Sequence, residues 1–349
     1  MKVSGTCSDN PCLKEREIVE PVMLCDSRGF LNQSAVGWAR KPIYDCNLKG
    51  HWNRKKKWNY WLIVSDRNLF SVTISNIDYA GLVFAYFYDF KSGLFIEKTI
   101  MLTPYKACKM PNNVGEGMEY KDKEASVAFA EEGGKTKIHL EMQEFGGKKL
   151  KAEFTIAHPE DHETLNVVIP WNQKTFQFTS KQNCLPAQGK VWLNNVEYLF
   201  KSGSTMASLD FGRGVWPRKS FWNWATCSGI NDGRAVGINL GGGWTDGTGM
   251  TENAVIVGSK ISKINDRMIF TYDINDLMKP WRIKTEATDR VDLEFKPVYK
   301  RRARTNIVIV ASDIYQMFGY FSGNVITDDG EKVNIKNIFG CAEEHKAKW

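Results

Sequence analysis

Short segments in which apolar and polar residues alternate follow one another along almost the whole chain. They are rich in aromatic and β-branched residues and end at clusters of glycine, asparagine and aspartate. Because successive residues of a strand point to opposite faces of a sheet, this period predicts an all-β protein. The expected strands are 58–66, 69–76, 79–90, 94–102, 126–130, 135–143, 148–157, 163–170, 221–228, 234–240, 254–258, 267–272, 282–285, 291–297, 306–311, 315–326 and 332–339.

Helix signals are nearly absent, and the best candidate for a helix is the carboxy-terminal segment 342–349. Some of the expected strands are joined by glycine pairs, such as Gly133-Gly134 and Gly146-Gly147, that are typical of hairpin turns. Many short strands at close spacing indicate a sandwich or a barrel.

The two halves of the chain resemble each other at three places in the same order. Ordered similarity of this kind indicates a tandem duplication of an antiparallel barrel, with extra loop residues in the first half. The alternative is chance similarity among β-rich segments. The paired segments are 55–74 with 219–238, 151–156 with 292–297, and 189–200 with 323–335.

A chain of 349 residues is also long for one compact domain. We therefore expect two tandem barrels, the first in a domain of residues 1–200 that includes a cysteine-bearing leader, and the second in residues 201–349.

The net charge of +7 is distributed in short islands, of which 54–57 and 300–304 are the strongest. Both islands adjoin expected strands and are predicted to lie in solvent-exposed connecting loops. Weak contact with an anionic membrane surface is one consequence that we expect of such loops. No nucleic-acid-binding motif is present, so nucleic acid is not an expected partner.

No apolar run is long enough to cross a bilayer, and the first residues lack the apolar region of a secretion signal. These features predict a cytoplasmic protein, in which the eight cysteines are expected to be reduced. Cys7, Cys12, Cys25 and Cys46 could together bind zinc, but their spacing lacks the paired short loops of zinc ribbons. No metal site is predicted.

Long motifs in a fixed order cover nearly the whole chain, and on these motifs the sequence resembles the bacterial family called domain of unknown function 2804. The leader with Cys7 and Cys12 departs from the family pattern and has no assigned role. The motifs are L-C-D-S-R-G-F-L-N-Q-S-A-V-G-W-A-R-K-P (24–42), W-N-Y-W (58–61), L-D-F-G-R-G-V-W-P-R-K-S-F-W-N-W (209–224), D-G-R-A-V-G-I-N-L-G (232–241), T-E-N-A (251–254), P-W-R-I (280–283), Q-M-F-G-Y-F-S-G (316–323) and F-G-C-A-E-E-H-K-A-K-W (339–349).

A more distant resemblance rests on the strand with Trp222 and Trp224, followed by D-G-R at 232–234. This arrangement is similar to that of tandem lipocalin-like proteins, a group with carotenoid hydratases, tocopherol cyclases and ceramide-carrying survival-factor proteins. The resemblance implies two calycin-type barrels side by side. It implies no particular activity, because one fold hosts unrelated functions.

The stretch 208–229 is the strongest candidate for a site. It combines three of the twelve tryptophans with charged residues, which suggests an apolar wall beside a few fixed polar groups. The alternative is a core strand preceded by a basic turn. Within this stretch we expect Asp210 and Arg213 to form a structural ion pair, since buried charges need partners.

If the halves are duplicates, the polar residues after 200 and after 339 fall at related positions and face each other across the seam between the barrels. A carboxyl group in an apolar cavity has a raised pKa and can protonate an alkene or enol ether, while tryptophan rings stabilise the resulting cation. For an enzyme, the candidate catalytic residues are Glu252, Glu343 and His345. The candidate ligand-binding residues are Asp210, Arg213, Trp216, Trp222, Trp224, Asn253, Trp281 and Gln316.

The first functional hypothesis is binding or carrying of a hydrophobic, lipid- or isoprenoid-like molecule, with Arg213 contacting its polar head group. The alternative is a hydratase, cyclase or isomerase of such a molecule. A third, weaker hypothesis is carbohydrate binding. A carboxyl group buried in a cavity without a basic partner would favour the enzyme.

Other catalytic classes have little support in the sequence. There is no phosphate-binding glycine loop and no serine nucleophile elbow, so no cofactor is expected. A nucleophilic pair of Cys341 and His345 is an alternative that lacks an orienting residue.

Overall fold

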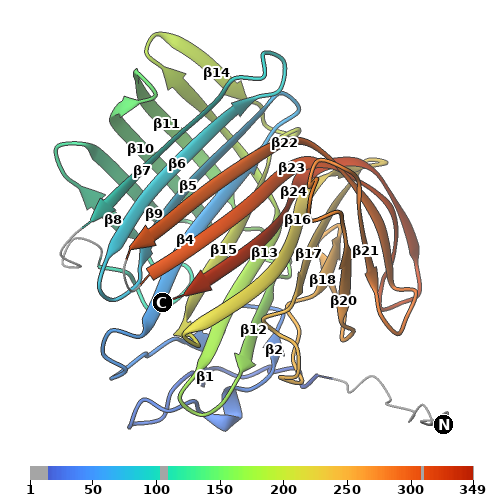
Figure 1. Ribbon diagram of the computed structural model, residues 1–349. Helices are drawn as coiled ribbons and strands as arrows, with labels where there is room; N and C mark the ends of the chain where they lie inside the picture. Colours follow the sequence, from blue (N-terminus) through green and yellow to red (C-terminus); the bar gives the residue numbers. More distant parts are fainter. Residues whose placement is uncertain (1–14, 103–108, 308–309, 349) are drawn as a thin grey trace.

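The computed structural model describes residues 15–102, 109–307 and 310–348. Its named elements are strands, apart from one short 3-10 turn, η1 (Gln33–Ala35). Two large antiparallel sheets curl into tandem lipocalin-like barrels, as the alternating pattern and the distant resemblance together predict. The strands β22 to β24, coloured orange to red, lie across the blue strands of the first sheet (Figure 1).

The first sheet has the strand order β7-β6-β5-β4-β15-β13-β11-β10-β9-β8. Strands β12 (Leu165–Pro170) and β14 (Val196–Phe200) pair with β13, and β2 (Trp38–Ala39) extends β12; β1 (Val22–Met23) and β3 (Tyr44–Asp45) form a separate parallel pair. The main strands are β4 (Lys55–Val64), β5 (Asn68–Asn76), β6 (Gly81–Asp89), β7 (Phe95–Leu102), β8 (Met118–Lys121), β9 (Ala125–Glu132), β10 (Lys135–Phe145), β11 (Lys148–Ala157), β13 (Phe176–Leu193) and β15 (Met206–Val215).

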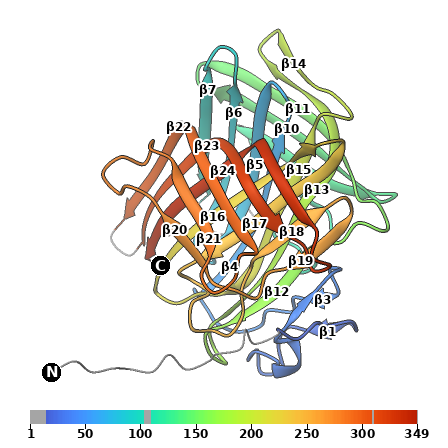
Figure 2. The ribbon, with the colours of Figure 1, turned by 90° about the vertical axis from the view of Figure 1, so that its right-hand side faces the viewer.

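The second sheet repeats this order as β19-β18-β17-β16-β24-β23-β22-β21-β20, and it faces the viewer in Figure 2. Strand β16 corresponds to β4, β24 to β15, and β23 to β13, which confirms the internal duplication. The strands are β16 (Lys219–Asn231), β17 (Arg234–Gly242), β18 (Ala254–Val257), β19 (Lys260–Lys263), β20 (Met268–Thr271), β21 (Trp281–Thr285), β22 (Val291–Ile307), β23 (Val310–Ile326) and β24 (Lys332–Lys348).

The change from one sheet to the other falls between Val215 and Lys219. Strand β15 therefore lies in the first sheet although it follows residue 200. The division into domains 1–200 and 201–349 stays a prediction about folding units.

Two expectations about local structure are wrong. The segment 342–349 was expected to be helical, but its described part, through Lys348, belongs to β24, which pairs with β16 on one side and β23 on the other. The strand expected at 306–311 instead spans the end of β22 and the start of β23. Pairing with distant strands determines the structure of both segments. A strand with a partner on each side forms as many backbone hydrogen bonds as a helix does.

The basic islands are also not loop tips. Residues 55–57 belong to β4 and 300–304 to β22, and Lys56 and Arg301 are buried. Lys56 donates a hydrogen bond to the Ile77 carbonyl oxygen, and Arg301 pairs with Glu97 at 2.6 Å. These two side chains are therefore not exposed on loops, where they were expected to attract an anionic membrane surface.

Each barrel has its own apolar core, and two further apolar clusters lie between the two sheets. On β4, Trp61 and Ile63 point into the first barrel, whereas Tyr60 and Leu62 point toward Phe318 and the rest of the second sheet. The period of two thus sends one face of each central strand to its own barrel and the other face to the seam.

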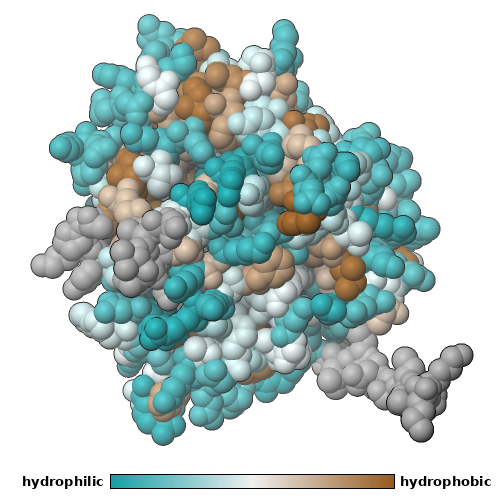
Figure 3. Space-filling model, in the orientation of Figure 1, coloured by the Kyte–Doolittle hydropathy of each residue, from teal (hydrophilic) through white to brown (hydrophobic). Residues whose placement is uncertain are grey.

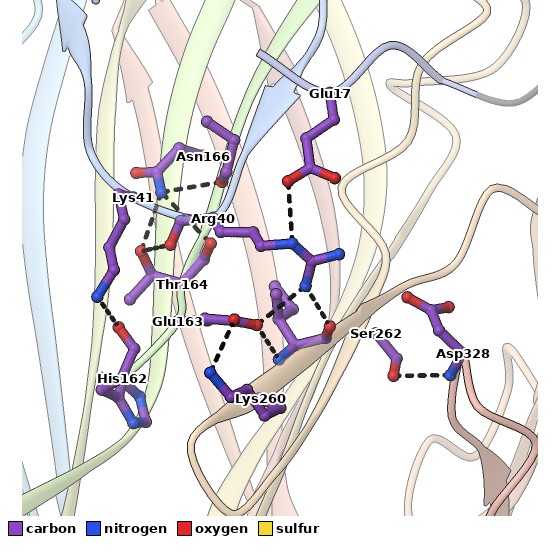
Figure 4. A network of polar contacts seen from close by, with 12 residues as sticks. Glu17, Arg40, Lys41, His162, Glu163, Thr164, Asn166, Lys260, Ser262 and Asp328 are labelled. Atoms are coloured by element: carbon purple, nitrogen blue, oxygen red, sulfur yellow. Dashed lines mark hydrogen bonds and ion pairs between the residues drawn. The ribbon is translucent and has the colours of Figure 1, made fainter. Parts of the chain in front are cut away.

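A polar network joins the two sheets at the lower edge of the seam (Figure 4). The Arg40 guanidinium lies 2.9 Å from carboxylate oxygens of both Glu17 and Glu163 and donates to the Ile261 carbonyl oxygen. Glu163 also pairs with Lys260 of β19 at 3.2 Å. Side chains from the amino-terminal part of the chain, together with Glu163 just before β12, therefore hold the edge of the second sheet.

Apolar side chains on the face shown in Figure 3 are scattered among hydrophilic ones. The described residues include no helix that could span a membrane. Five described cysteines are buried and free, whereas Cys7, Cys12 and Cys108 lie outside the described residues. The five are Cys25, Cys46, Cys184, Cys227 and Cys341.

Candidate functional site

A cavity of about 490 Å³ lies in the seam between the two sheets. Strands β4, β5, β6, β7, β13 and β15 supply one wall, and β16, β22, β23 and β24 supply the opposite wall. The loop 243–253, between β17 and β18, contributes Trp244 and Glu252. We call this space the seam cavity.

The period of two within strands explains which side chains reach the seam cavity. Trp222 and Trp224 are two residues apart on β16, and Glu343 and His345 are two residues apart on β24, so each pair shares a face. The same face of β23 presents Gln316. The intervening residues of these strands point into the second barrel or its surface.

Trp216 is the centre of a tryptophan cluster that forms one end of the seam cavity. Its ring centroid lies 5.0 Å from that of Trp171, 5.1 Å from Trp244, 5.4 Å from Trp222 and 5.9 Å from Trp58. Trp216 itself is 4% exposed. The rings pack on one another and form a rigid apolar wall, rather than the row of exposed rings expected for carbohydrate stacking.

A buried charged cluster stands on the first-sheet side. Lys181 pairs with Asp210 at 2.9 Å and with Glu252 at 3.1 Å, and its ammonium lies 4.6 Å from the centroid of the Trp224 ring. Burial alone would lower the pKa of Lys181, but the two carboxylates raise it above its ordinary value. Burial raises the pKa of Glu252, and Lys181 only partly offsets this. The Trp244 indole donates to Glu252 Oε1 at 2.5 Å.

Glu343 has a different environment on the second-sheet side. Its carboxyl group is buried, and it accepts hydrogen bonds from Trp222 Nε1 at 2.9 Å and from Gln316 Nε2 at 3.3 Å. Within the described part of the chain, no basic side chain lies within ion-pairing distance of it. Burial therefore raises the pKa of Glu343 to about 7.

His345 is held as a neutral imidazole beside this acid. Its Nε2 atom is 2.7 Å from Ser312 Oγ, and its ring centroid is 4.0 Å from that of Trp222. Burial lowers the pKa of His345 to about 3, so it carries no charge at physiological pH.

Gln316 offers a polar atom with no protein partner. Its Oε1 atom is buried and has no hydrogen-bond partner among the described residues, although its Nε2 atom contacts Glu343. A buried carbonyl oxygen without a partner is costly, so a ligand with an O–H or N–H group would gain by meeting it.

The structure brings most of the predicted site residues together. Those that line the seam cavity are Asp210, Trp216, Trp222, Trp224, Glu252, Gln316, Glu343 and His345.

The predicted ion pair of Asp210 and Arg213 is wrong. Residues three apart on a strand point to opposite faces, so Arg213 lies inside the first barrel while Asp210 meets Lys181 in the seam. The Arg213 guanidinium hydrogen-bonds the Pro111, Trp58 and Gly212 carbonyl oxygens and Asn59 Oδ1, and burial lowers its pKa to about 9. Arg213 therefore does not line the seam cavity.

Two other predicted ligand-binding residues lie in the structural framework. Asn253 accepts a hydrogen bond from the Gly241 amide and donates one to the Asp266 carbonyl oxygen, which fixes the loop before β18. Trp281 is 1% exposed in the core of the second barrel, and its indole donates to the Leu277 carbonyl oxygen. Neither side chain lines the seam cavity.

Sequence reasoning missed Lys181, Trp58, Tyr60, Trp244 and Arg301, which also line the seam cavity. Signals existed for three of them. Lys181 is the one charged residue in 176–189, and Trp58 and Tyr60 occupy the repeat positions of Trp222 and Trp224. Trp244 and Arg301 carry no local pattern that marks them, because loop closure and strand curvature bring them to the site.

Comparisons with known proteins support the fold. A family model described as domain of unknown function (DUF2804) matches residues 15–349. The solved structure of CghA with Sch210972 is 9% identical, covers 85% of this chain and 88% of its own, and has a TM-score of 0.52, which indicates a shared fold. Kievitone hydratase from Nectria haematococca is 7% identical, with coverage of 85% and 89% and a TM-score of 0.45. No curated protein sequence matches the chain.

Proposed function

The chain belongs to the DUF2804 family, and we propose that it binds a hydrophobic, lipid- or isoprenoid-like molecule in the seam cavity and protonates it through Glu343. The reaction is a hydration, cyclisation or isomerisation that needs no cofactor. The observation that carries the proposal is the buried Glu343 carboxyl group, which forms no salt bridge with any described residue and accepts hydrogen bonds from an indole and an amide. An acid catalyst needs such a group, whereas a carrier gains nothing from it.

The seam cavity suits a hydrophobic molecule. Its volume of about 490 Å³ is within the ordinary range for small-molecule sites. Tryptophan rings form one end, and Leu82, Phe84 and Ile314 line the walls. The charged groups are confined to the Lys181 cluster, Arg301 and Glu343, so most of a ligand would contact apolar surface.

Glu343 is suited to proton donation near neutral pH. With a pKa of about 7, roughly half of the molecules carry the proton at pH 7. The proton would move to one carbon of a ligand double bond, whose π electrons form the new C–H bond and leave a cation on the other carbon. The Trp222 and Trp224 rings can stabilise that cation, and the Trp222 indole hydrogen bond supports the carboxylate left behind.

The Glu343 carboxylate can then complete the reaction. Removal of a proton from a carbon next to the cation gives an isomer. Attack of water on the cation, with its proton passing to Glu343, gives an alcohol. Attack by a second double bond of the ligand closes a ring before proton loss. Each route restores the neutral acid and consumes no other reactant than the ligand and water.

Native mass spectrometry and denaturing extraction of the protein from its own cells test this proposal. We expect the Glu343→Gln variant to retain a hydrophobic compound that the wild-type protein converts to an isomer or to a product heavier by one water. The variant should convert it at least about 100-fold more slowly. Glu344→Gln is the matched control, because Glu344 points away from the seam and accepts a hydrogen bond from Tyr272 at 2.6 Å.

Other outcomes would contradict one part of the proposal or the other. Equal conversion by Glu343→Gln would remove the proton-transfer role. A compound that is bound but converted by neither protein would favour the carrier. If nothing co-purifies and the apolar probe 1-anilinonaphthalene-8-sulfonate is not taken up, the hydrophobic binding site itself is overturned.

A further inference from the structure

The duplication places the Glu343 site and the Asp210 site in equivalent positions. In the first sheet, Asp210 of β15 is paired in register with Tyr60 of β4 and with Lys181 of β13. In the second sheet, Glu343 of β24 is paired in register with its neighbours on β16 and β23 in the same way. The equivalent rows are Tyr60–Asp210–Lys181 and Trp224–Glu343–Gln316.

The sequence repeat supports the same correspondence independently of the sheet pairing. Alignment of 55–74 with 219–238 places Tyr60 on Trp224. Both rows also face the seam cavity, from opposite walls. The two carboxyl groups therefore occupy duplicated positions. The rows differ in charge at the residue that pairs with each carboxyl group from the neighbouring strand, β13 in the first sheet and β23 in the second.

That neighbour is a cation in one row and a neutral amide in the other. Lys181 Nζ is 2.9 Å from Asp210 Oδ2, whereas Gln316 Nε2 is 3.3 Å from Glu343 Oε2. Glu343 is buried and Asp210 is partly buried, and an adjacent cation is the strongest stabiliser of a buried carboxylate. An amide donates a hydrogen bond but adds no charge.

We propose that Gln316, by occupying the position of Lys181, is the positioning residue that leaves Glu343 without an ion-pair partner and makes it the proton donor of the two equivalent acids. Lys181 forms an ion pair with the duplicate, Asp210. This assignment rests on the proposed function for its catalytic meaning, but the difference in protonation between the two rows can be measured without any substrate.

The other charged and titratable groups described around Glu343 do not supply the positive charge that a lysine at position 316 would supply. Lys181 is committed to Asp210 and Glu252, and Arg301 pairs with Glu97 at 2.6 Å. His345, Tyr60 and Cys341 face the same space and are uncharged near neutral pH, because burial lowers the pKa of the histidine and raises the pKa values of the other two. The uncharged neighbour on β23 is thus the feature that distinguishes the two rows.

Difference infrared spectroscopy of the ligand-free protein tests the inference through the carbonyl band of a protonated carboxyl group. In the wild-type protein we expect a band that titrates near pH 7 and is missing from Glu343→Gln. In Gln316→Lys this band should be lost at pH 7, because an ordinary or lower pKa reduces the protonated fraction from about one half to below one hundredth. Gln316→Met, which adds no charge, should keep the band.

The reciprocal change guards against a variant that does not fold. In Lys181→Gln, Asp210 and Glu252 both lose their cation, so a new band should appear that Asp210→Asn and Glu252→Gln together remove. In the double variant Lys181→Gln with Gln316→Lys, the Glu343 band should stay lost. Folding of each variant is checked by its thermal transition. If Gln316→Lys folds and still shows the Glu343 band at pH 7, or if Lys181→Gln folds and shows no new band, the inference is overturned.

These results are separable from the fate of the proposed function. A shifted band without any bound or converted compound would leave the inference standing and remove the enzyme. Conversion of a compound by Gln316→Lys at the wild-type rate, together with an unmoved band, would keep the enzyme and remove the role of Gln316.

Discussion

At the scale of single residues, burial and neighbouring charge act on Glu343 and Asp210 in different proportions. Both are carboxylic acids at equivalent positions, yet one is held by a lysine and the other by an indole and an amide. The hydrogen bonds to Glu343 lower its pKa by less than burial raises it. The protonation of this one side chain therefore couples the stability of the fold to pH.

We expect Glu343 to make the protein less stable as the pH rises. The folded-state pKa is about 7 and the ordinary value is 4.5, so the unfolded chain releases the proton first. Its contribution to the free energy of unfolding is full below about pH 4.5, falls between pH 4.5 and 7, and is then lower by about 3 kcal/mol. Urea unfolding at pH 5 and pH 8 measures this change.

Glu343→Gln should remove this contribution to the pH dependence, so that the variant gains stability relative to the wild type at pH 8 but not at pH 5. Glu344→Gln, on the opposite face of the same strand, serves as the control. An unchanged difference in stability between the two pH values would show that Glu343 has an ordinary pKa.

At the scale of secondary structure, the strand β24 carries both the acid and a close contact with its neighbour. A Cβ atom on Gly340 would lie 2.2 Å from the Thr226 carbonyl oxygen and 2.6 Å from Cys227 Cβ, both on β16. Glycine is therefore required where β24 curves against β16. The same curvature aims Glu343 and His345 into the seam cavity.

Gly340→Ala should destabilise the protein by about 1–3 kcal/mol, because the backbone of β16 must move to admit a methyl group. The free energy of unfolding in urea measures the loss. Lys348→Ala, at an exposed position of the same strand, should change it by less than about 0.5 kcal/mol. Equal effects of the two substitutions would contradict the close approach of the strands.

At the scale of the whole molecule, the amino-terminal segment is tied to the second sheet by a buried ion pair. Glu15 Oε1 lies 2.9 Å from Lys263 Nζ, and both side chains are almost fully buried. Burial raises the pKa of Glu15 and lowers that of Lys263, so each charge depends on the other. This pair attaches the segment before β1 to strand β19. The network around Arg40 contacts the same strand.

Removal of either partner should therefore cost more than removal of both. We expect Glu15→Gln to lower the free energy of unfolding by about 3–5 kcal/mol, because it leaves the Lys263 ammonium buried and unpaired. Glu15→Leu combined with Lys263→Met should recover most of this loss in a double-mutant cycle. Lys260→Met, which removes an exposed charge paired with Glu163, should cost less than about 1 kcal/mol. Additive effects at 15 and 263 would contradict the buried pair.

The sequence by itself determined the fold class and the duplication, and eight of the residues that it singles out line the seam cavity. Alternation with a period of two is a local property, so it places Trp222 with Trp224 and Glu343 with His345 on shared faces without knowledge of the rest of the chain. Glycine pairs such as Gly133-Gly134, which adopt positive φ angles, likewise mark their turns locally. The tertiary structure alone decided which faces meet.

Only pairing between distant strands showed that Asp210 contacts Lys181 instead of Arg213, and that Trp281 and Asn253 serve the framework. The segment after 341 became a strand for the same reason, since β16 and β23 both pair with it. The physical reason is that burial and charge pairing depend on what the other sheet brings across the seam. Local periodicity gives the direction of a side chain, but not the partner that it meets.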